Sequence, residues 1–187
     1  MTEIMTTSPL WDRAEIGGKN TLIERPLCGK INLRSDPEQA RFLARAREAF
    51  GLDLPLDPNT LARSQDSTCF WLGPDEWLIH CPLDEAASRI ESGRSKLARV
   101  HHALVDVSDY YTVLRLEGPD SAALLARGCP LDLHRSRFPA GTCAQTRFGN
   151  ASILLHKTGE TPAFDIQVRW SFAEYVWDYL ASAMQAL

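Results

Sequence analysis

The chain has 187 residues, of which 44% are hydrophobic and 24% charged, and its formal net charge is −4. This is ordinary globular composition, and the chain is long enough to bury a core without disulfides. The pI near 5.7 argues against nucleic acid or an anionic membrane as the main partner, because both require a basic surface. Arg41, Arg45 and Arg47 do cluster, but they fit the solvated side of a helix.

The first residues of the chain and its cysteines indicate the cellular compartment in which it is expected. Residues 1–9 are polar and lack the apolar segment of a secretory signal, and no run approaches the length that spans a bilayer. We therefore expect a cytoplasmic chain whose thiols are reduced and mostly buried. Residues 1–20 are predicted to form a flexible N-terminal arm. The cysteines are odd in number and do not occur as closely spaced pairs in the sequence: Cys28, Cys69, Cys81, Cys129 and Cys143.

The first half of the chain is predicted to alternate strands with helices. Extended segments and helices are expected, in order, at residues 21–34, 37–50, 68–72, 76–81 and 84–97. Ser35 or Asp36 stands at the capping position of the first helix, and Gly51 follows it where a left-handed residue would end it. The segment 52–67 is rich in turn residues and is predicted to be a surface loop.

The second half repeats this order. Strands are expected at residues 110–116, 143–148, 152–157 and 163–169, with a helix at 121–127 and another after Ser171. Pro119 suits the first turn of the short helix, and Gly128 is expected to end it in the left-handed conformation. Ser171 and Glu174 have the spacing of a capping box. The last helix places one apolar face at helical spacing: Val176, Tyr179, Leu180, Ala183 and Leu187.

The two halves share sequence as well as order. Residues 37–45 match residues 119–127 at a constant offset of 82, with Pro, Ala, Leu, Ala and Arg identical, and the strand 31–34 aligns with 113–116 at the same offset. The sequence therefore predicts an α+β fold of two β-α-β-β-α halves with mainly antiparallel sheets. The body is expected to run from residue 21 to 187 as two interlocked halves, about 21–100 and 101–187.

Cysteine and histidine residues are the first candidates for chemistry. Such side chains can act as nucleophile and base, or supply most of a zinc site. Their spacing matches no metal-binding knuckle, so buried thiols and surface imidazoles are the simpler interpretation. Adjacent histidines on a strand would face opposite sides, which is poor for chelation. The candidates are Cys129, His134, Cys143 and His156, with His101 and His102 as the adjacent pair.

Carboxylates beside the predicted strand 110–116 are the second set. These are Asp106, Asp109, Glu117 and Asp120. Asp106 and Asp109 lie three positions apart and would face opposite sides of a strand, so they could act as an acid–base pair only if the backbone turns at Ser108. The chain also lacks a phosphate-binding glycine loop and a nucleophile elbow. We therefore predict no catalytic, cofactor-binding or metal-binding residue.

Aromatic residues are frequent on the predicted strands and turns. Most must be in the core, and any surplus would form an exposed apolar patch of the kind that marks a permanent partner surface. The residues are Trp71, Trp77, Tyr110, Tyr111, Phe148, Phe164 and Trp170.

Five segments resemble the gamma subunit of heterotetrameric sarcosine oxidase. They are ERPLCGKINLR (24–34), WLGPDEWLI (71–79), VDVSDYYTVLRLEGPDSAALLARGCPLDLH (105–134), FPAGTCAQT (138–146) and FDIQVRWSFAEYVWDYL (164–180). The resemblance covers nearly the whole chain after Ser8. That family also resembles the folate-binding domain of the glycine-cleavage aminomethyltransferases, an internally duplicated α+β fold, which agrees with the repeat.

The resemblance implies a role inside a complex. That complex oxidatively demethylates sarcosine at FAD, passes electrons through FMN to oxygen to give hydrogen peroxide, and transfers the one-carbon unit to tetrahydrofolate, giving glycine and 5,10-methylenetetrahydrofolate. The implied partners are the alpha, beta and delta subunits. The flavins, NAD and folate are expected on alpha and beta and zinc on delta, which leaves this chain as a non-catalytic scaffold without a cofactor of its own.

Two other functions remain open at this point. One is a stand-alone tetrahydrofolate-binding one-carbon transferase, although the chain lacks the additional domains of those enzymes. The other is a cysteine enzyme that uses Cys129 or Cys143. An isolated chain that has lost its partners could also form a homo-oligomer.

Overall fold

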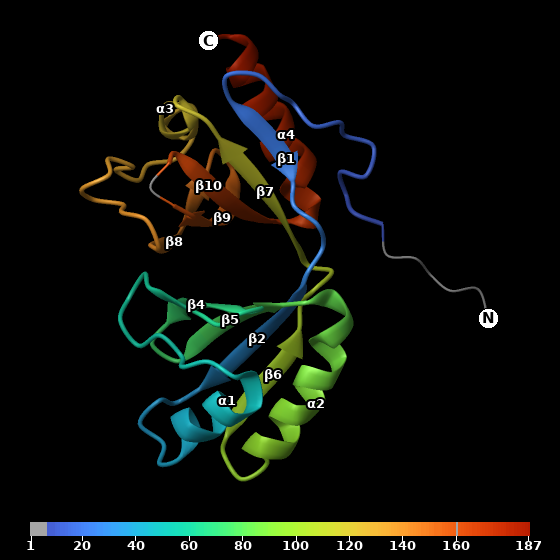
Figure 1. Cartoon of the computed structure of the whole chain (residues 1–187), viewed down its shortest axis with the longest axis vertical. Coiled ribbons are helices and arrows are strands. Elements are labelled where there is room, and N and C mark those ends of the chain that lie inside the picture. The colour runs from blue at the N-terminus through green and yellow to red at the C-terminus, as the bar shows by residue number, and fades with distance from the viewer. Residues whose placement is uncertain (1–6, 160) are drawn as a thin grey trace, which may run out of the picture. The chain divides into compact units, whose positions relative to one another are not determined.

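The chain is divided into two compact units. The computed structural model describes residues 7–159 and 161–187, so the expectation for the first six residues of the arm lies outside the described residues. The middle unit is Cys28–Ser108, and the composite unit joins the residues up to Leu27 with Asp109–Leu187. Each unit contains one five-stranded sheet (Figure 1).

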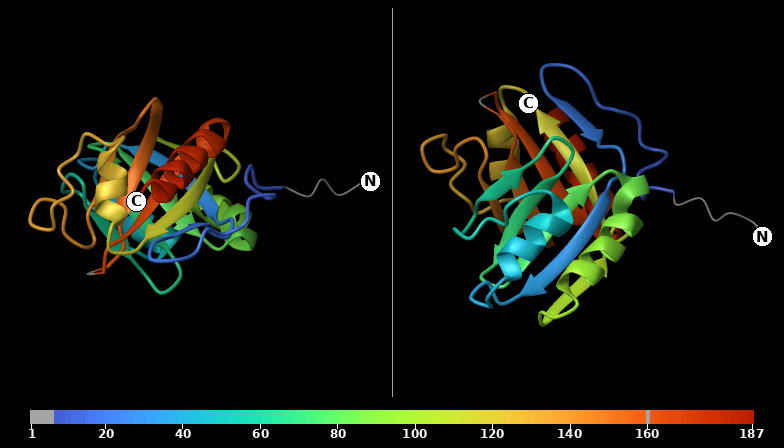
Figure 2. Two further views of the ribbon diagram at one scale, coloured as in Figure 1. Left: turned by 90° about the horizontal axis from the view of Figure 1, so that it is seen from above. Right: turned by 60° about the horizontal axis from the view of Figure 1, so that its bottom comes forward.

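The middle unit follows the predicted order of strands and helices. Its elements are β2 (Gly29–Ser35), α1 (Phe42–Phe50), β3 (Leu61–Arg63), β4 (Thr68–Gly73), β5 (Glu76–Cys81), η1 (Leu83–Glu85), α2 (Ala86–Leu97) and β6 (His102–Asp106). The sheet order is β3-β4-β5-β2-β6, with antiparallel neighbours throughout. Figure 2 (right) shows α1 and α2 together over one face of this sheet.

The composite unit repeats this arrangement with one change of connection. Its elements are β1 (Thr21–Glu24), β7 (Tyr111–Glu117), α3 (Ser121–Ala126), β8 (Cys143–Phe148), β9 (Ala151–Lys157), β10 (Ala163–Arg169) and α4 (Trp170–Gln185). The sheet order is β1-β7-β10-β9-β8, again antiparallel. Figure 2 (left) shows α4 lying across the strands of this unit.

The two sheets have the same topology if β1 is counted as the strand that follows α4. Each unit is then a β-α-β-β-α-β motif with one additional edge strand, β3 or β8. The middle unit takes its last strand, β6, from the residues after α2, whereas the composite unit takes β1 from the start of the chain. The predicted duplicated α+β fold is confirmed.

The division of the chain differs from the boundary expected near residue 100. β6 pairs with β2, so the middle unit continues to Ser108. β1 pairs with β7, so the segment before Leu27 belongs with the second half. Sequence similarity between repeats identifies equivalent strands but not the sheet in which a terminal strand is paired.

The strand alignment proposed from the sequence is wrong by one residue. β2 and β7 have bounds 82 positions apart at both ends (29 and 111, 35 and 117). However, Ile31 and Leu33 lie in the core of the middle unit, while Leu114 and Leu116 lie in that of the composite unit. Successive side chains of a strand face opposite sides, so the structural counterpart of Leu33 is Leu116, at an offset of 83.

Helix ends account for most of the other differences. α1 starts at Phe42, not at residue 37, after Arg41 in the left-handed region with φ of 72°. Asp36 instead accepts a hydrogen bond from the Glu38 amide, 2.9 Å away, and so forms a turn. Gly51 is confirmed as the left-handed end of α1.

The second half differs at both of its helices. α4 begins at Trp170 without a side-chain cap, so the capping box predicted at Ser171 is wrong. Gly128 does not have a positive φ. A Cβ there would lie 2.9 Å from the Phe148 ring, so Gly128 is required by close packing instead of by its backbone angles.

Each unit has its own apolar core between its helices and its sheet. Trp77 is fully buried in the middle unit, lies against the Phe42 ring in a tilted arrangement at a centroid distance of 5.7 Å, and donates its indole N–H to the Pro55 carbonyl at 2.7 Å. In the composite unit the predicted face of α4 is only partly buried, since Tyr179 is half-buried and Leu187 exposed. Trp177, which the periodicity does not place, is buried there.

From Thr7 onward the arm is packed against the composite unit, whereas the sequence predicts a flexible segment. Leu10 is buried in the core, and Ile16 forms an antiparallel bridge with Leu22 of β1. Arg13 forms an ion pair with Asp178 of α4 at 3.2 Å. Polar composition suggested disorder, but a few spaced apolar residues are enough to fix the segment.

A buried lysine connects the two ends of the middle unit. Lys30 is 1% exposed, and its ammonium group donates to the carbonyl oxygens of Cys28 at 3.1 Å and Ser108 at 3.4 Å. The hydroxyl of Ser108 also accepts from the Lys30 amide at 2.9 Å. Because a buried ammonium requires such acceptors, Lys30 holds the two points where the chain enters and leaves this unit.

We expect Gly118→Ala to destabilise the composite unit. Gly118 has φ of 130°, and a Cβ there would lie 2.4 Å from the Asn20 side-chain oxygen, which accepts from the Asp120 amide. Strain and the lost hydrogen bond should lower the free energy of unfolding by about 2 kcal/mol or more, measured by urea denaturation. Gly17→Ala is the control, because a Cβ at Gly17 meets nothing within 4 Å. Equal stability of the two variants would contradict this packing.

Candidate functional site

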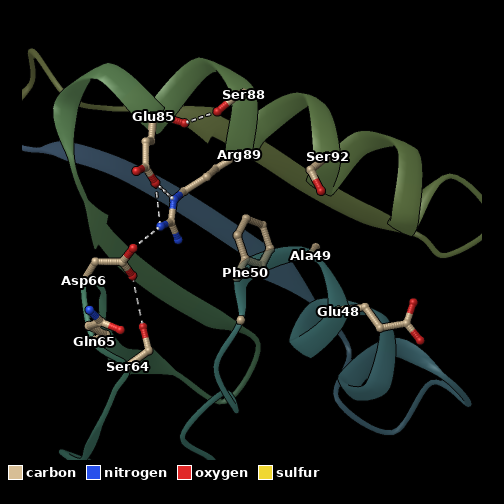
Figure 3. A pocket seen from close by; sticks show the side chains of 11 residues that line it. Glu48, Ala49, Phe50, Ser64, Gln65, Asp66, Glu85, Ser88, Arg89 and Ser92 are labelled. Carbon is tan, nitrogen blue, oxygen red and sulfur yellow. Dashed lines mark hydrogen bonds and ion pairs between the residues drawn. The ribbon is translucent and has the colours of Figure 1, made fainter.

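A surface depression in the middle unit contains the most extensive charged network of that unit. It has a volume of about 520 Å³ and lies between α1, the start of α2 and the turn that joins β3 to β4. Its lining includes Glu48, Phe50, Asp66, Glu85 and Arg89 (Figure 3).

Arg89 is the centre of this network. Its Nε and one terminal nitrogen bind Glu85 at 2.9 and 2.7 Å, an i, i+4 pair at the beginning of α2. The terminal nitrogens also bind Asp66 at 2.9 Å and the Ser67 hydroxyl at 2.9 Å. Figure 3 shows the guanidinium between the two carboxylates, with the Phe50 ring nearby. Arg89 therefore connects η1, α2 and the β3–β4 turn.

The pKa shifts follow from this geometry. Burial acts to raise the pKa of Asp66, but the Ser67 hydroxyl and the Arg89 charge outweigh it and hold this pKa below its ordinary value. Burial acts to lower the pKa of Arg89, while its hydrogen bond to Glu85 and the charge of Asp66 raise it overall. Both residues are thus charged near neutral pH, and their groups bind each other.

Cys81 lies behind this network and is not activated by it. Burial raises its pKa to about 11, and the nearby Arg89 charge compensates only in part. A nucleophilic cysteine needs a lowered pKa, so Cys81 is an inert core residue near neutral pH.

The cysteine and histidine candidates are only partly brought together. Cys129 is buried in the loop after α3, with its sulfur 4.0 Å from the Thr146 hydroxyl, while His134 is exposed and binds Ser136. Cys143 and His156 are cross-strand partners on β8 and β9. The sequence predicts buried thiols and surface imidazoles, and this prediction is wrong for His156, which is buried.

The Cys143–His156 pair continues into a polar row across the sheet of the composite unit. His156 is opposite Asp165 on β10, and Asp165 is opposite Arg115 on β7. Arg115 binds both oxygens of Asp165 at 2.8 and 2.9 Å, and this hydrogen bonding raises the pKa of Arg115. His156 Nδ1 lies 4.0 Å from Asp165, beyond hydrogen-bonding distance, so Asp165 is bound mainly by arginine.

Four of the remaining candidates have structural partners. Asp106 accepts from the amide and hydroxyl of Ser108, so the backbone does turn there. His101 donates its amide to Gln39, whereas the His102 ring binds the Val100 carbonyl. Asp120 binds Lys19 and Asn20, Lys19 foremost, and its pKa is lowered as a result. Among the described residues no three His, Cys, Asp or Glu side chains are grouped so that they could hold a metal ion.

The Arg89 network was not identified from the sequence. The i, i+4 spacing of Glu85 and Arg89 was the available signal, but such pairs are common on solvated helices. Asp66 and Ser67 lie about twenty positions earlier in a turn, and their proximity to Arg89 depends on the folded sheet.

Known proteins resemble this chain over most of its length. The family described as "SoxG: Sarcosine oxidase, gamma subunit family" matches residues 34–186. The sarcosine oxidase subunit gamma of Corynebacterium sp. (strain U-96) is 32% identical over 176 residues, which cover 92% of this chain and 84% of that protein.

Solved structures agree with this result. A chain of heterotetrameric sarcosine oxidase from Corynebacterium sp. U-96, in complex with pyrrole 2-carboxylate, has a TM-score of 0.87 and 30% identity, covering 96% of this chain and 94% of that one. Aminomethyltransferase T of the glycine cleavage system from Bartonella henselae has a TM-score of 0.61 at 11% identity, covering 85% of this chain and 44% of that one.

The fold thus places the chain among duplicated α+β proteins of the aminomethyltransferase type, although it covers less than half of that enzyme chain. A stand-alone transferase is accordingly not favoured. By sequence, the chain belongs to the sarcosine oxidase gamma subunit family.

We expect Arg89→Met to destabilise the middle unit. The methionine keeps part of the apolar stem but leaves Asp66 and Glu85 facing each other without a cation, which should cost about 2 kcal/mol of unfolding free energy. Arg94→Met on the same helix is the matched control, because Arg94 is 60% exposed and lies 3.9 Å from Glu91, so the change should be below about 0.5 kcal/mol. Equal urea midpoints for the two variants would show that the network contributes nothing.

We also expect part of the stability to be lost in acid through Asp66. Its pKa is lower in the folded than in the unfolded chain, so its contribution is present above the unfolded value and is lost as the pH falls through the folded value. Asp66→Asn should therefore reduce the difference between the unfolding free energies at pH 6 and pH 3, measured by circular dichroism. A wild-type slope in Asp66→Asn would contradict the assigned shift.

Proposed function

We propose that this chain is the non-catalytic gamma subunit of a heterotetrameric sarcosine oxidase. The complex would demethylate sarcosine to glycine with oxygen and tetrahydrofolate, giving hydrogen peroxide and 5,10-methylenetetrahydrofolate. The observation that carries the proposal is the match to a chain of that oxidase over nearly the full length of both chains, with a TM-score of 0.87.

The charged residues of this chain support a structural role. Arg89 and Arg115 are each bound to carboxylates of their own unit, so these groups stabilise the fold and are not free to bind a substrate carboxylate. The raised pKa of Cys81 also argues against a reactive thiol there. In this proposal no residue of the chain is catalytic, binds a cofactor or binds a metal.

The partners in this proposal are the alpha, beta and delta subunits. FAD, FMN, NAD and tetrahydrofolate would be bound by alpha and beta, and zinc by delta. We propose a cytoplasmic location for the complex. None of the helices within residues 7–159 and 161–187 is both long and apolar enough to cross a membrane.

The test is co-expression with the other three subunits from the same organism. We expect a single complex with one copy of each chain and sarcosine-dependent peroxide production, because the active site is assembled from the partners. The chain expressed alone should self-associate and have no oxidase activity. A monodisperse monomer that does not bind the other subunits would refute the proposal.

Substitution of the cysteines separates this role from that of a cysteine enzyme. Cys129→Ser and Cys143→Ser complexes should retain wild-type peroxide production per assembled complex. Quantifying assembly in the same samples corrects for any loss of folding. A Cys variant that assembles fully but loses activity would instead indicate a catalytic thiol.

A further inference from the structure

The outer edge of β1 is closed by the chain itself. The amide and carbonyl of Leu22 exchange hydrogen bonds with those of Ile16, at 2.9 and 3.0 Å. Ile16 runs antiparallel to β1 and packs its half-buried side chain against the composite core. At Leu22, therefore, the edge strand β1 does not leave its outer hydrogen-bonding groups unpaired.

β6 occupies the same place in the middle unit. Leu22 is paired with Leu116 of β7, and Leu104 is paired with Leu33 of β2. Since Leu33 and Leu116 are structural counterparts, Leu104 is the counterpart of Leu22. Both leucines are buried.

The hydrogen-bond alternation shows which groups of β6 face outward. The Val107 amide donates to the Lys30 carbonyl at 2.9 Å, so Val107 faces β2, as do Val105 and Ala103 two and four residues earlier. The backbone groups of His102, Leu104 and Asp106 therefore point away from the sheet. For Leu104 this is the orientation that Leu22 has toward Ile16.

Nothing equivalent to Ile16 pairs with this edge in the described part of the chain. β6 is the terminal strand of its sheet, visible beside β2 in Figure 1, and β2 is its one paired neighbour among the described residues. Ala103, Val105 and Asp106 are exposed, Val105 by 50%. The other outer strands are less suitable, because β3 has three residues and β8 exposes the polar Gln145 and Arg147.

We propose that an extended segment of a partner subunit pairs with the outer edge of β6. This inference rests on the proposed function, which supplies the partner chains. The segment runs antiparallel to β6, exchanges hydrogen bonds with Leu104, and places an apolar side chain beside it, as Ile16 does at Leu22. The duplication supports this occupant: the composite unit closes the equivalent edge with its own Ile16, and in this proposal the middle unit receives the corresponding segment from another polypeptide.

Amide hydrogen exchange on the four-subunit complex tests this directly. The amides of His102, Leu104 and Asp106 should exchange at least about tenfold more slowly in the complex than in the isolated chain. The outward amides of β8 are the internal reference and should not change. Equal exchange on β6 in the two samples overturns the inference, and so does full protection in the isolated chain, since the edge would then be closed without a partner subunit.

A variant at Val105 provides the second readout. Val105→Glu places a charge beside the incoming segment without entering the core, and should lower the yield of assembled complex about tenfold. Val105→Thr keeps the shape and should assemble normally, as should Leu56→Glu, an exposed leucine (52%) elsewhere in the same unit. Normal assembly of Val105→Glu overturns the inference.

The test also distinguishes this inference from the proposed function. If the wild-type chain does not assemble with the three subunits, the proposed function fails. If it assembles while the β6 amides remain unprotected, the complex is real and only the edge pairing is wrong.

Discussion

The pairing of β1 with β7 is the constraint on which the composite unit depends. A β-α-β-β-α half leaves the inner strand of its sheet with one unpaired edge, and burying those amides and carbonyls without partners would be costly. The middle unit satisfies the constraint with β6, which follows directly in the chain, and the composite unit with residues nearly a hundred positions away. The arm, the hydrogen bonds between Asn20 and Asp120, and the close approach of Gly118 to Asn20 all serve to hold β1 in place.

The duplicated order of elements could be predicted because alternation and helical spacing are local properties. The residue-by-residue alignment of β2 with β7 could not be predicted. Ile31 and Val113 are both β-branched and apolar, and only their core contacts show that they face different sides of their sheets. Helix starts were misjudged for a similar reason. Ser35, Asp36 and Ser171 suit caps, yet the chain uses Asp36 for a turn and lets Ser171 fall inside a helix.

The candidate site residues could be predicted even less well, because residues that are neighbours in the fold are far apart in the sequence. Cys143 and His156 are thirteen positions apart without a recognisable spacing, yet a single hairpin makes them neighbours. Proximity alone does not create a reactive centre, since the adjoining Asp165 is bound by Arg115. Arg89 was overlooked because its partners come from a distant turn. Both arginines bind carboxylates within their own unit, so their charges are used to stabilise the fold.

The origin of β1 has a consequence for synthesis on the ribosome. Cys28–Ser108 is contiguous and can fold as soon as it emerges, but the N-terminal strand must wait for β7 and the residues after it to be translated. During that interval Leu10, Leu22 and their neighbours remain without their core, a state that favours holdase chaperones and premature contacts with nascent partner chains. A circular permutant with β1 joined after α4 would remove this delay, because the second half would then fold from contiguous residues as the first half does.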